Sequence, residues 1–217
     1  MTTTAAARPR RKRAGQYHHG DLRRALIEQA LRVIETTGVE ALTLRSVGAA
    51  LGVSRTALYR HFADKEALLA AVAREGFRLL RQALVDAWEQ NGRGTAGFEA
   101  MGGAYLQFAI DHPSHYRVMF GRFVESRERD AALEVESEAA FTALVEALTA
   151  MQRDGLARAD DPVLQARFVW SVTHGIAMLV IDGQLRSCDD DAAALNRYAA
   201  ERLRQALSVE PAPTAHH

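Results

Sequence analysis

The stretch "GVSRTALYRHFADKEALL", Gly52 to Leu69, decides the fold of this chain. It holds two helical patterns, and each follows a residue whose side chain can cap a helix. Ser54 precedes the first pattern and Asp64 the second, since Ser and Asp oxygens accept hydrogen bonds from the free N–H groups of a first helical turn. A short helix to about Phe62 and a long helix after it are therefore expected.

A further short helix is expected immediately before this stretch. Thr43 can cap it, and the residues "ALGVS" then join it to the helix that follows Ser54. Gly52 lies in this join, where the chain must adopt a positive φ, and Gly48 is small at the point where the two helices would cross. Two short helices with a glycine-containing turn indicate a helix-turn-helix.

The helix after Ser54 has one apolar side and one side that carries polar chemistry. If Leu58 faces the core, a rotation of about 100° per residue places Phe62 on the same side. The opposite face then holds a hydroxyl, a phenol and a guanidinium, with an imidazole at its edge: Thr56, Tyr59, Arg60 and His61. Arginine can read guanine edges in the major groove, and Tyr and His can bind phosphates. This face predicts contact with DNA.

Lys65 opens the long helix that follows. A cation in a first helical turn opposes the helix dipole and costs about 0.3–1 kcal/mol. A DNA phosphate above that helix end would offset the cost. Pairing with Asp64 or Glu66 is the alternative, and the neighbouring polar face favours the phosphate.

The rest of the chain also reads as helices. Asp21 can cap a helix that Gly38 ends, and "NGRGTAG" (Asn91–Gly97) is the expected linker after the long helix. Four or five more helical patterns follow, and no alternating strand pattern is present. We predict an all-α fold with a three-helix helix-turn-helix domain at 17–64 and a larger helical regulatory and dimerisation domain at 65–208. A disordered basic arm (1–16) and a disordered tail (209–217) are expected at the ends.

Charge is distributed unevenly along a chain whose net charge is zero. Up to Lys65 there are 12 Lys and Arg residues against 5 Asp and Glu, and the remainder carries 15 against 22. This asymmetry suggests that the N-terminal part meets a polyanion. The arm "RPRRKR" supplies five of these cations, and it either reaches DNA or acts as a solubilising extension.

Composition favours a soluble cytoplasmic protein with no membrane partner. The single Cys188 excludes an internal disulfide. The opening "MTTTAAARPRRKR" lacks the apolar region of a signal peptide, and the longest apolar run, "GIAMLVI", is too short to span a bilayer.

The segment "YHHGDLRRALIEQALRVIETTGVEALTLRSVGAALGVSRTALYRHFADKEALLAAV", Tyr17 to Val72, resembles the DNA-binding domain of tetracycline-repressor-type (TetR) regulators. The resemblance implies that "SRTALYRHF" is the recognition helix. Gly48 departs from the family pattern, in which alanine is more usual, and should weaken its helix by about 0.5–1 kcal/mol. By this resemblance, the residues expected to contact DNA bases or phosphates are Thr43, Arg45, Arg55, Thr56, Tyr59, Arg60, His61 and Lys65.

The C-terminal half contains a segment, Phe168 to Ile181, that is apolar on nearly every side. Such a helix must be covered all round, by its own subunit and by a second copy of the chain. The TetR resemblance likewise implies a homodimer joined by the last two helices. Small residues expected at that interface are Ser171, Gly175 and Ala199.

The resemblance also implies a ligand cavity inside each subunit. Candidates for its lining, each of which could instead be plain core, are Met101, Tyr105, Phe108, Tyr116, Met119, Phe120, Phe141, Trp170, His174 and Met178. The segment "WSVTHG" (Trp170–Gly175) is similar to a Trp-x-x-x-His-Gly signature in one branch of the family. His174 either lines the cavity or is a satisfied core or interface histidine.

These features predict a DNA-binding transcriptional regulator, namely a homodimeric repressor released from a near-palindromic operator by a small-molecule effector. The alternative is an activator or an effector-independent DNA-binding protein of the same fold. An enzyme is the third hypothesis, because Ser171, His174 and Asp182 follow one another closely, but no nucleophile elbow or phosphate-binding loop accompanies them. No cofactor or metal is expected, since His18–His19 lacks further ligands at zinc spacing.

Overall fold

The computed structural model describes residues 19–122, 130–185 and 188–208, so the predicted arm and tail lie outside it. The described residues form nine α-helices and no strand, which confirms the all-α prediction. In chain order the helices are α1 (His19–Thr37), α2 (Leu44–Ala50), α3 (Arg55–His61), α4 (Lys65–Gln90), α5 (Gly94–Asp111), α6 (Pro113–Phe120), α7 (Ala131–Arg153), α8 (Pro162–Ile181) and α9 (Cys188–Leu207).

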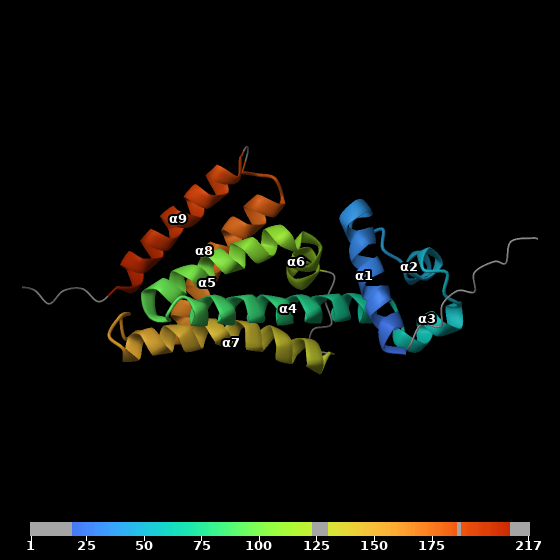
Figure 1. The fold of residues 1–217 in the computed structure, drawn as a ribbon, viewed down its shortest axis with the longest axis horizontal. Coiled ribbons are helices and arrows are strands. Elements are labelled where there is room, and N and C mark those ends of the chain that lie inside the picture. Colours follow the sequence, from blue (N-terminus) through green and yellow to red (C-terminus); the bar gives the residue numbers. More distant parts are fainter. Residues whose placement is uncertain (1–18, 123–129, 186–187, 209–217) are drawn as a thin grey trace, which may run out of the picture.

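The molecule is elongated, with α1, α2 and α3 grouped at one end and α5 to α9 bundled at the other (Figure 1). The long helix α4 belongs to both parts: it packs against α1 at its start and against α5, α6 and α7 along the rest of its length. Movement of α4 would therefore displace its neighbours in both the N-terminal helices and the bundle.

The short helices begin where the capping residues predicted. Thr43 Oγ1 accepts a hydrogen bond from the Ser46 N–H at 3.0 Å, and Ser54 Oγ accepts one from the Ala57 N–H at 3.2 Å. Asp64 Oδ1 accepts one from the Ala67 N–H at 2.8 Å. These three caps fix where α2, α3 and α4 start, and so fix the helix-turn-helix.

Two predicted boundaries are wrong. α1 begins at His19, so Asp21 lies inside the helix and not before its first turn. The expected linker at Asn91–Gly97 is also too long, because α5 begins at Gly94. A Cβ on Gly97 would lie 2.9 Å from the Trp88 carbonyl oxygen, so this glycine permits close packing of α5 on α4 rather than marking a loop.

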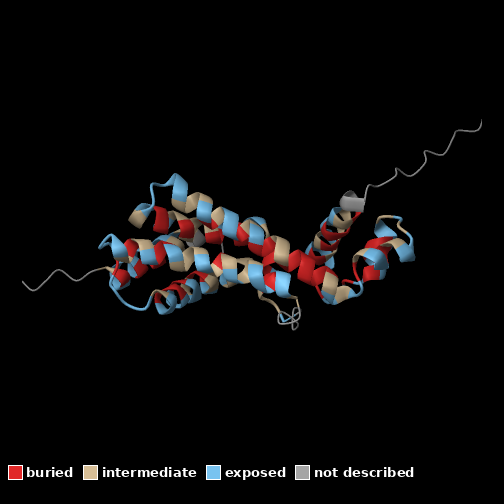
Figure 2. Cartoon of the chain, turned by 90° about the horizontal axis from the view of Figure 1, so that it is seen from below, coloured by how far each residue is buried: buried red, intermediate tan, exposed pale blue. Residues whose placement is uncertain are grey.

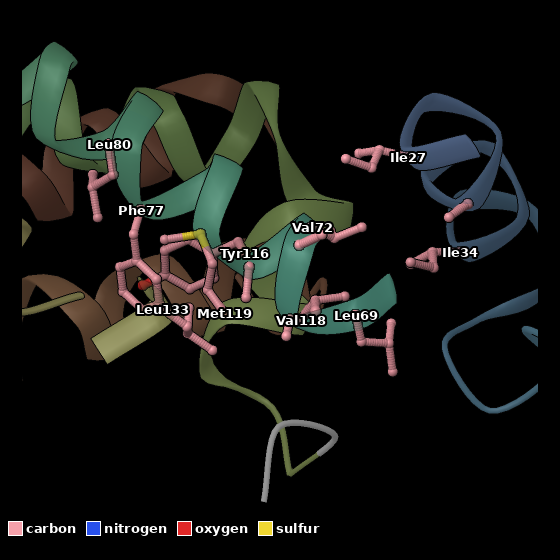
Figure 3. Close-up of a cluster of buried hydrophobic side chains, with 14 of the residues drawn as sticks. Ile27, Ile34, Leu69, Val72, Phe77, Leu80, Tyr116, Val118, Met119 and Leu133 are labelled. Atoms are coloured by element: carbon pink, nitrogen blue, oxygen red, sulfur yellow. The ribbon is translucent and has the colours of Figure 1, made fainter. Parts of the chain in front are cut away.

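One hydrophobic cluster continues from α1 through α4 into the bundle. Ile27 and Ile34 of α1 lie opposite Leu69 and Val72 of α4, and Val118 of α6 belongs to the same cluster (Figure 3). The buried residues are continuous where the N-terminal helices meet the bundle (Figure 2). The helix-turn-helix is thus joined to the bundle by shared core.

Among the described helices, α8 alone is long and apolar enough to cross a membrane by length and composition, with a hydropathy of 1.3. Ser171, Thr173 and His174 interrupt its apolar residues, so the sequence of this helix contains no long uninterrupted apolar run. α8 packs against α5, α7 and α9 in the bundle. One third of its most apolar segment is buried in the bundle, and length and composition alone are weak evidence for a membrane span.

Candidate nucleic-acid interface and internal cavity

α3 is oriented as its sequence predicted. Leu58 and Phe62 are each only 3% exposed, and they hold α3 against the helices behind it. Thr56 and Arg60 are exposed on the opposite side, and Tyr59 is 46% exposed. His61 is half-buried at the edge of this face. The rotation of α3 is therefore confirmed.

Gly48 allows α2 and α3 to cross closely. A Cβ at this position would lie 3.0 Å from Leu58 Cδ2, and the Gly48 carbonyl accepts a hydrogen bond from the Val53 N–H at 3.0 Å. An alanine would require Leu58 to move by a few tenths of an ångström. The close packing of Leu58 thus explains why position 48 has glycine, where alanine is more usual in the family.

A hollow of about 340 Å³ lies between α2 and α3, beside the outward face of α3. Two cationic side chains, Arg45 and Arg55, line it together with Tyr59. The Arg55 guanidinium lies 5.6 Å from the centroid of the Tyr59 ring, a cation–π distance that orients both side chains. Arg45, Arg55 and Tyr59 are thereby gathered at one place, where their cations suit a phosphate.

Lys65 is tied to the chain in a way the sequence did not predict. Its Nζ donates to the carbonyl oxygens of Val39 at 2.8 Å and Glu40 at 3.1 Å. The alternative of pairing with Asp64 or Glu66 is wrong, and Asp64 instead caps α4. Because an ammonium has three donors, one N–H remains after these two bonds. Lys65 fastens the start of α4 to the loop between α1 and α2.

The helical bundle contains a cavity of about 280 Å³ that is partly open to solvent, and its walls come from α4 to α9. Half of the predicted lining residues are found there: Met101, Tyr105, Phe120, Phe141 and Trp170. The other half lie outside its lining: Phe108, Tyr116, Met119, His174 and Met178. Phe108, Tyr116 and Met119 are at most 4% exposed and belong to the core.

Several lining residues were not predicted from the sequence. α4 contributes Phe77, Leu80 and Leu84, and α9 contributes Asn196, Ala199, Ala200 and Leu203. Ala199, which was predicted at a dimer interface, is 9% exposed in the single chain and faces the cavity of its own subunit. The apolar spacing along α4 was a usable signal for its part of the wall. In α9 the apolar residues Leu195, Ala199, Leu203 and Leu207 recur at helical spacing, so they also indicated which side turns inward.

A chain of hydrogen bonds lies next to the cavity. Trp170 Nε1–H donates to the Tyr105 hydroxyl at 3.1 Å, and the Tyr105 and Tyr116 hydroxyls lie 2.9 Å apart. The Tyr116 hydroxyl lies 2.6 Å from His174 Nδ1. Since an indole N–H can only donate, a consistent direction runs from Trp170 to Tyr105 to Tyr116 to His174. His174 is half-buried, and its Nδ1 has a hydrogen-bond partner inside the bundle.

Burial favours the neutral forms of the two tyrosines and the histidine in this hydrogen-bonded group. It raises the pKa of Tyr105 to about 12 and raises that of Tyr116 further, with the neighbouring Tyr105 hydroxyl adding to the second effect. Desolvation lowers the pKa of His174. A neutral imidazole keeps Nδ1 free to accept from Tyr116.

An exposed apolar stripe follows one side of α8. Leu164, Phe168 and Leu179 are 60%, 50% and 42% exposed, and helical spacing places Ser171 and Gly175 on the same side. Both small residues are exposed, as an interface role requires. The stripe is uncovered in a single chain.

The pairing required by the enzyme hypothesis is not formed. The Ser171 hydroxyl donates to the Arg167 carbonyl at 2.7 Å, while His174 Nδ1 is bound by tyrosine hydroxyls. Ser171 lies on the exposed stripe and His174 beside the cavity, so the two side chains point to different sides of α8.

Comparison with known proteins identifies both halves of the chain. Residues 26–72 match the family model of bacterial regulatory proteins of the tetR family, and residues 98–203 match the model of the tetracyclin repressor-like C-terminal domain. An uncharacterized HTH-type transcriptional regulator of Mycobacterium tuberculosis, Rv0681, is 27% identical over 78% of this chain and 75% of its own length. The HTH-type transcriptional repressor Rv1474c of the same organism is 40% identical over 27% of this chain and 31% of its own length.

Solved structures share the fold over nearly the whole chain. A protein of unknown function from Rhodococcus sp. RHA1 is 31% identical, with a TM-score of 0.79 over 89% of this chain and 98% of that one. The TetR family transcriptional regulator PfmR of Thermus thermophilus is 21% identical, with a TM-score of 0.67 over 86% of this chain and 99% of that one. At this identity the second likeness concerns the fold alone.

Proposed function

Because this chain belongs to the TetR family of transcriptional regulators, we propose that it is a homodimeric repressor that a small-molecule effector releases from a near-palindromic operator. The observation that carries the proposal is the outward face of α3. Thr56, Tyr59 and Arg60 are exposed there, while Leu58 anchors the opposite side in the core. A helix held in this way can enter a major groove and present donors to base edges.

The DNA contacts proposed for the neighbouring residues follow from where they lie. Arg45 and Arg55 line the hollow between α2 and α3, and Thr43 is exposed at the start of α2. These positions suit phosphate contacts, which fix the register of the recognition helix on the duplex. The remaining N–H of Lys65 suits a phosphate as well. The basic arm, at 1–16, would add salt-sensitive affinity.

Dimerisation is proposed through the exposed stripe of α8. Two copies in contact there would cover Leu164, Phe168 and Leu179, and Ser171 and Gly175 would permit close approach. We expect Phe168→Glu to yield monomers in size-exclusion chromatography with light scattering. Val135→Glu, at an apolar position on α7 that is 62% exposed, should leave the dimer intact. A dimeric Phe168→Glu would contradict the assignment of this interface.

The cavity is the proposed effector site. A ligand shifts a regulator only by binding one conformation better than the other. The cavity walls include α4, which also packs on α1, so occupancy of the cavity has a direct route to the helix-turn-helix. We further infer that the chain belongs to the branch with the Trp-x-x-x-His-Gly motif, since Trp170 and His174 hold Tyr105 and Tyr116 beside this cavity. Cytoplasmic localisation follows from the proposed role on DNA.

Selection from random duplex DNA tests the proposal. The wild-type chain should enrich a sequence with two related half-sites about 34–36 Å apart, the spacing of simple helix-turn-helix dimers. Failure to enrich any sequence above nonspecific background would contradict it. The position of the enriched sites relative to promoters then distinguishes repression from activation.

A further inference from the structure

The cavity in the bundle carries negative charge and no described positive charge in its wall. Its acidic lining residues are Glu99 on α5 and Glu138 on α7, and no described lining residue is Lys, Arg or His. Glu99 lies 3.7 Å from the Arg204 guanidinium, which offsets its charge. Glu138 has no ion pair among the described residues, and its side chain is exposed, so it stands where the cavity meets solvent.

Aromatic side chains form much of the remaining wall. Six of the lining residues are aromatic: Phe77, Phe98, Tyr105, Phe120, Phe141 and Trp170. Phe120 and Phe141 each lie 6.1 Å from Trp170 between ring centroids, so the rings form one group. Faces of aromatic rings attract cations and stack on flat ring systems.

The wall lacks the donors that an anion would need. Trp170 Nε1–H is used by the Tyr105 hydroxyl, and the Thr173 hydroxyl donates to the Val169 carbonyl at 3.0 Å. The Ser137 hydroxyl donates to the Glu134 carbonyl at 2.9 Å. Carboxylates and phosphates are normally bound by charged or backbone N–H donors. Among the described lining side chains, only the Asn196 amide has donors that are not already used.

The volume limits the size of the occupant. An apolar cavity of about 150 Å³ holds one benzene molecule. The present cavity of about 280 Å³ is nearly twice that size, which suits two fused rings.

We propose that the effector is an aromatic cation of about two fused rings, with its rings among Phe120, Phe141 and Trp170 and its positive charge toward the Glu138 carboxylate. This assignment rests on the proposed function, because it takes the cavity to be the effector site. Beyond the proposed function, the assignment specifies the charge and the shape of the ligand.

Three probes of nearly the same shape test the charge preference. They are 1-methylquinolinium (cation), 1-methylnaphthalene (neutral) and 1-naphthoate (anion), each titrated into the full-length protein while Trp fluorescence is followed. We expect the cation to bind at least about threefold more tightly than the neutral compound and at least about tenfold more tightly than the anion. Glu138→Gln should weaken cation binding by about threefold or more and leave 1-methylnaphthalene unchanged. Glu146→Gln, an exposed carboxylate on α7 outside the cavity, is the matched control.

Each outcome has a distinct consequence. Equal or tighter binding of 1-naphthoate, no advantage of the cation over the neutral probe, or no binding of any probe would overturn the proposed ligand class. The same titrations repeated on the operator complex test the effector role. A cation that binds with the expected preference but leaves the DNA complex intact would support the ligand class and contradict release by a cavity effector.

Discussion

The fastening of α4 by Lys65 leads to a prediction that separates a structural role from a role on DNA. Lys65→Met keeps most of the aliphatic stem and removes the ammonium. Two hydrogen bonds, of 2.8 and 3.1 Å, are then lost, and the carbonyl of the buried Val39 keeps only the longer bond from the Leu42 N–H at 3.3 Å. A hydrogen bond to a charged group contributes about 1.5–3 kcal/mol. Since this site is partly exposed, we expect the free energy of unfolding to fall by about 2–3 kcal/mol in total.

Urea unfolding and salt-dependent DNA binding measure the two roles separately. Each phosphate contact contributes a slope of about −0.9 to the plot of log affinity against log salt concentration. If the remaining N–H of Lys65 binds a phosphate, Lys65→Met reduces the magnitude of the slope by about that amount. Arg60→Gln, on the exposed face of α3, should weaken operator binding without lowering stability. Arg81→Gln, an exposed position further along α4, should change neither quantity.

Unchanged stability of Lys65→Met would refute the argument that its ammonium fastens α4 to the loop at Val39 and Glu40. An unchanged salt slope together with lower stability would leave the fastening in place and remove Lys65 from the phosphate contacts.

Two further predictions concern the bundle. Gly97→Ala should destabilise the protein by about 1–2 kcal/mol, because its Cβ would meet the Trp88 backbone and ring and the overpacking exceeds the helix gain. Gly103→Ala in the same helix has nothing within 4 Å and should stabilise by about 0.5–1 kcal/mol; denaturation midpoints in the opposite order would contradict this. Burial raises the pKa of Tyr105 from 10.0 to about 12. The neutral tyrosine therefore contributes about 3 kcal/mol to the free energy of unfolding below pH 10, and this contribution is lost as the pH rises through 12. The wild type should therefore lose about that much more stability than Tyr105→Phe between pH 9 and 12, and parallel losses would refute the assignment.

The parts of the fold that sequence predicted well are those set by local chemistry. Thr43, Ser54 and Asp64 cap α2, α3 and α4 because their side chains satisfy N–H groups three residues away. The orientation of α3 followed from one anchor, Leu58, and the regular helical rotation. Such features need no knowledge of other helices.

The parts that sequence missed depend on how helices are placed against one another. Ala199 was expected at a subunit interface and instead faces the cavity, because α9 packs against α5 and α8 through the apolar side that carries Ala199 and Leu203. Gly97 lies in the predicted linker, but it belongs to α5, where the lack of a side chain allows close packing against Trp88. The carbonyl partners of Lys65 lie 25 and 26 residues away in the sequence, beyond any local pattern.

The central claim is that the outward face of α3 reads DNA, and operator binding by Tyr59→Ala and Arg60→Ala tests it most directly. Both side chains are exposed, so neither substitution should change the free energy of unfolding or the oligomeric state. One base or phosphate contact contributes about 1–3 kcal/mol to the binding free energy, so its loss weakens binding roughly 5- to 150-fold. Gel-shift titrations on a selected operator should show such a loss for each variant. Wild-type affinity in both variants would contradict the claim.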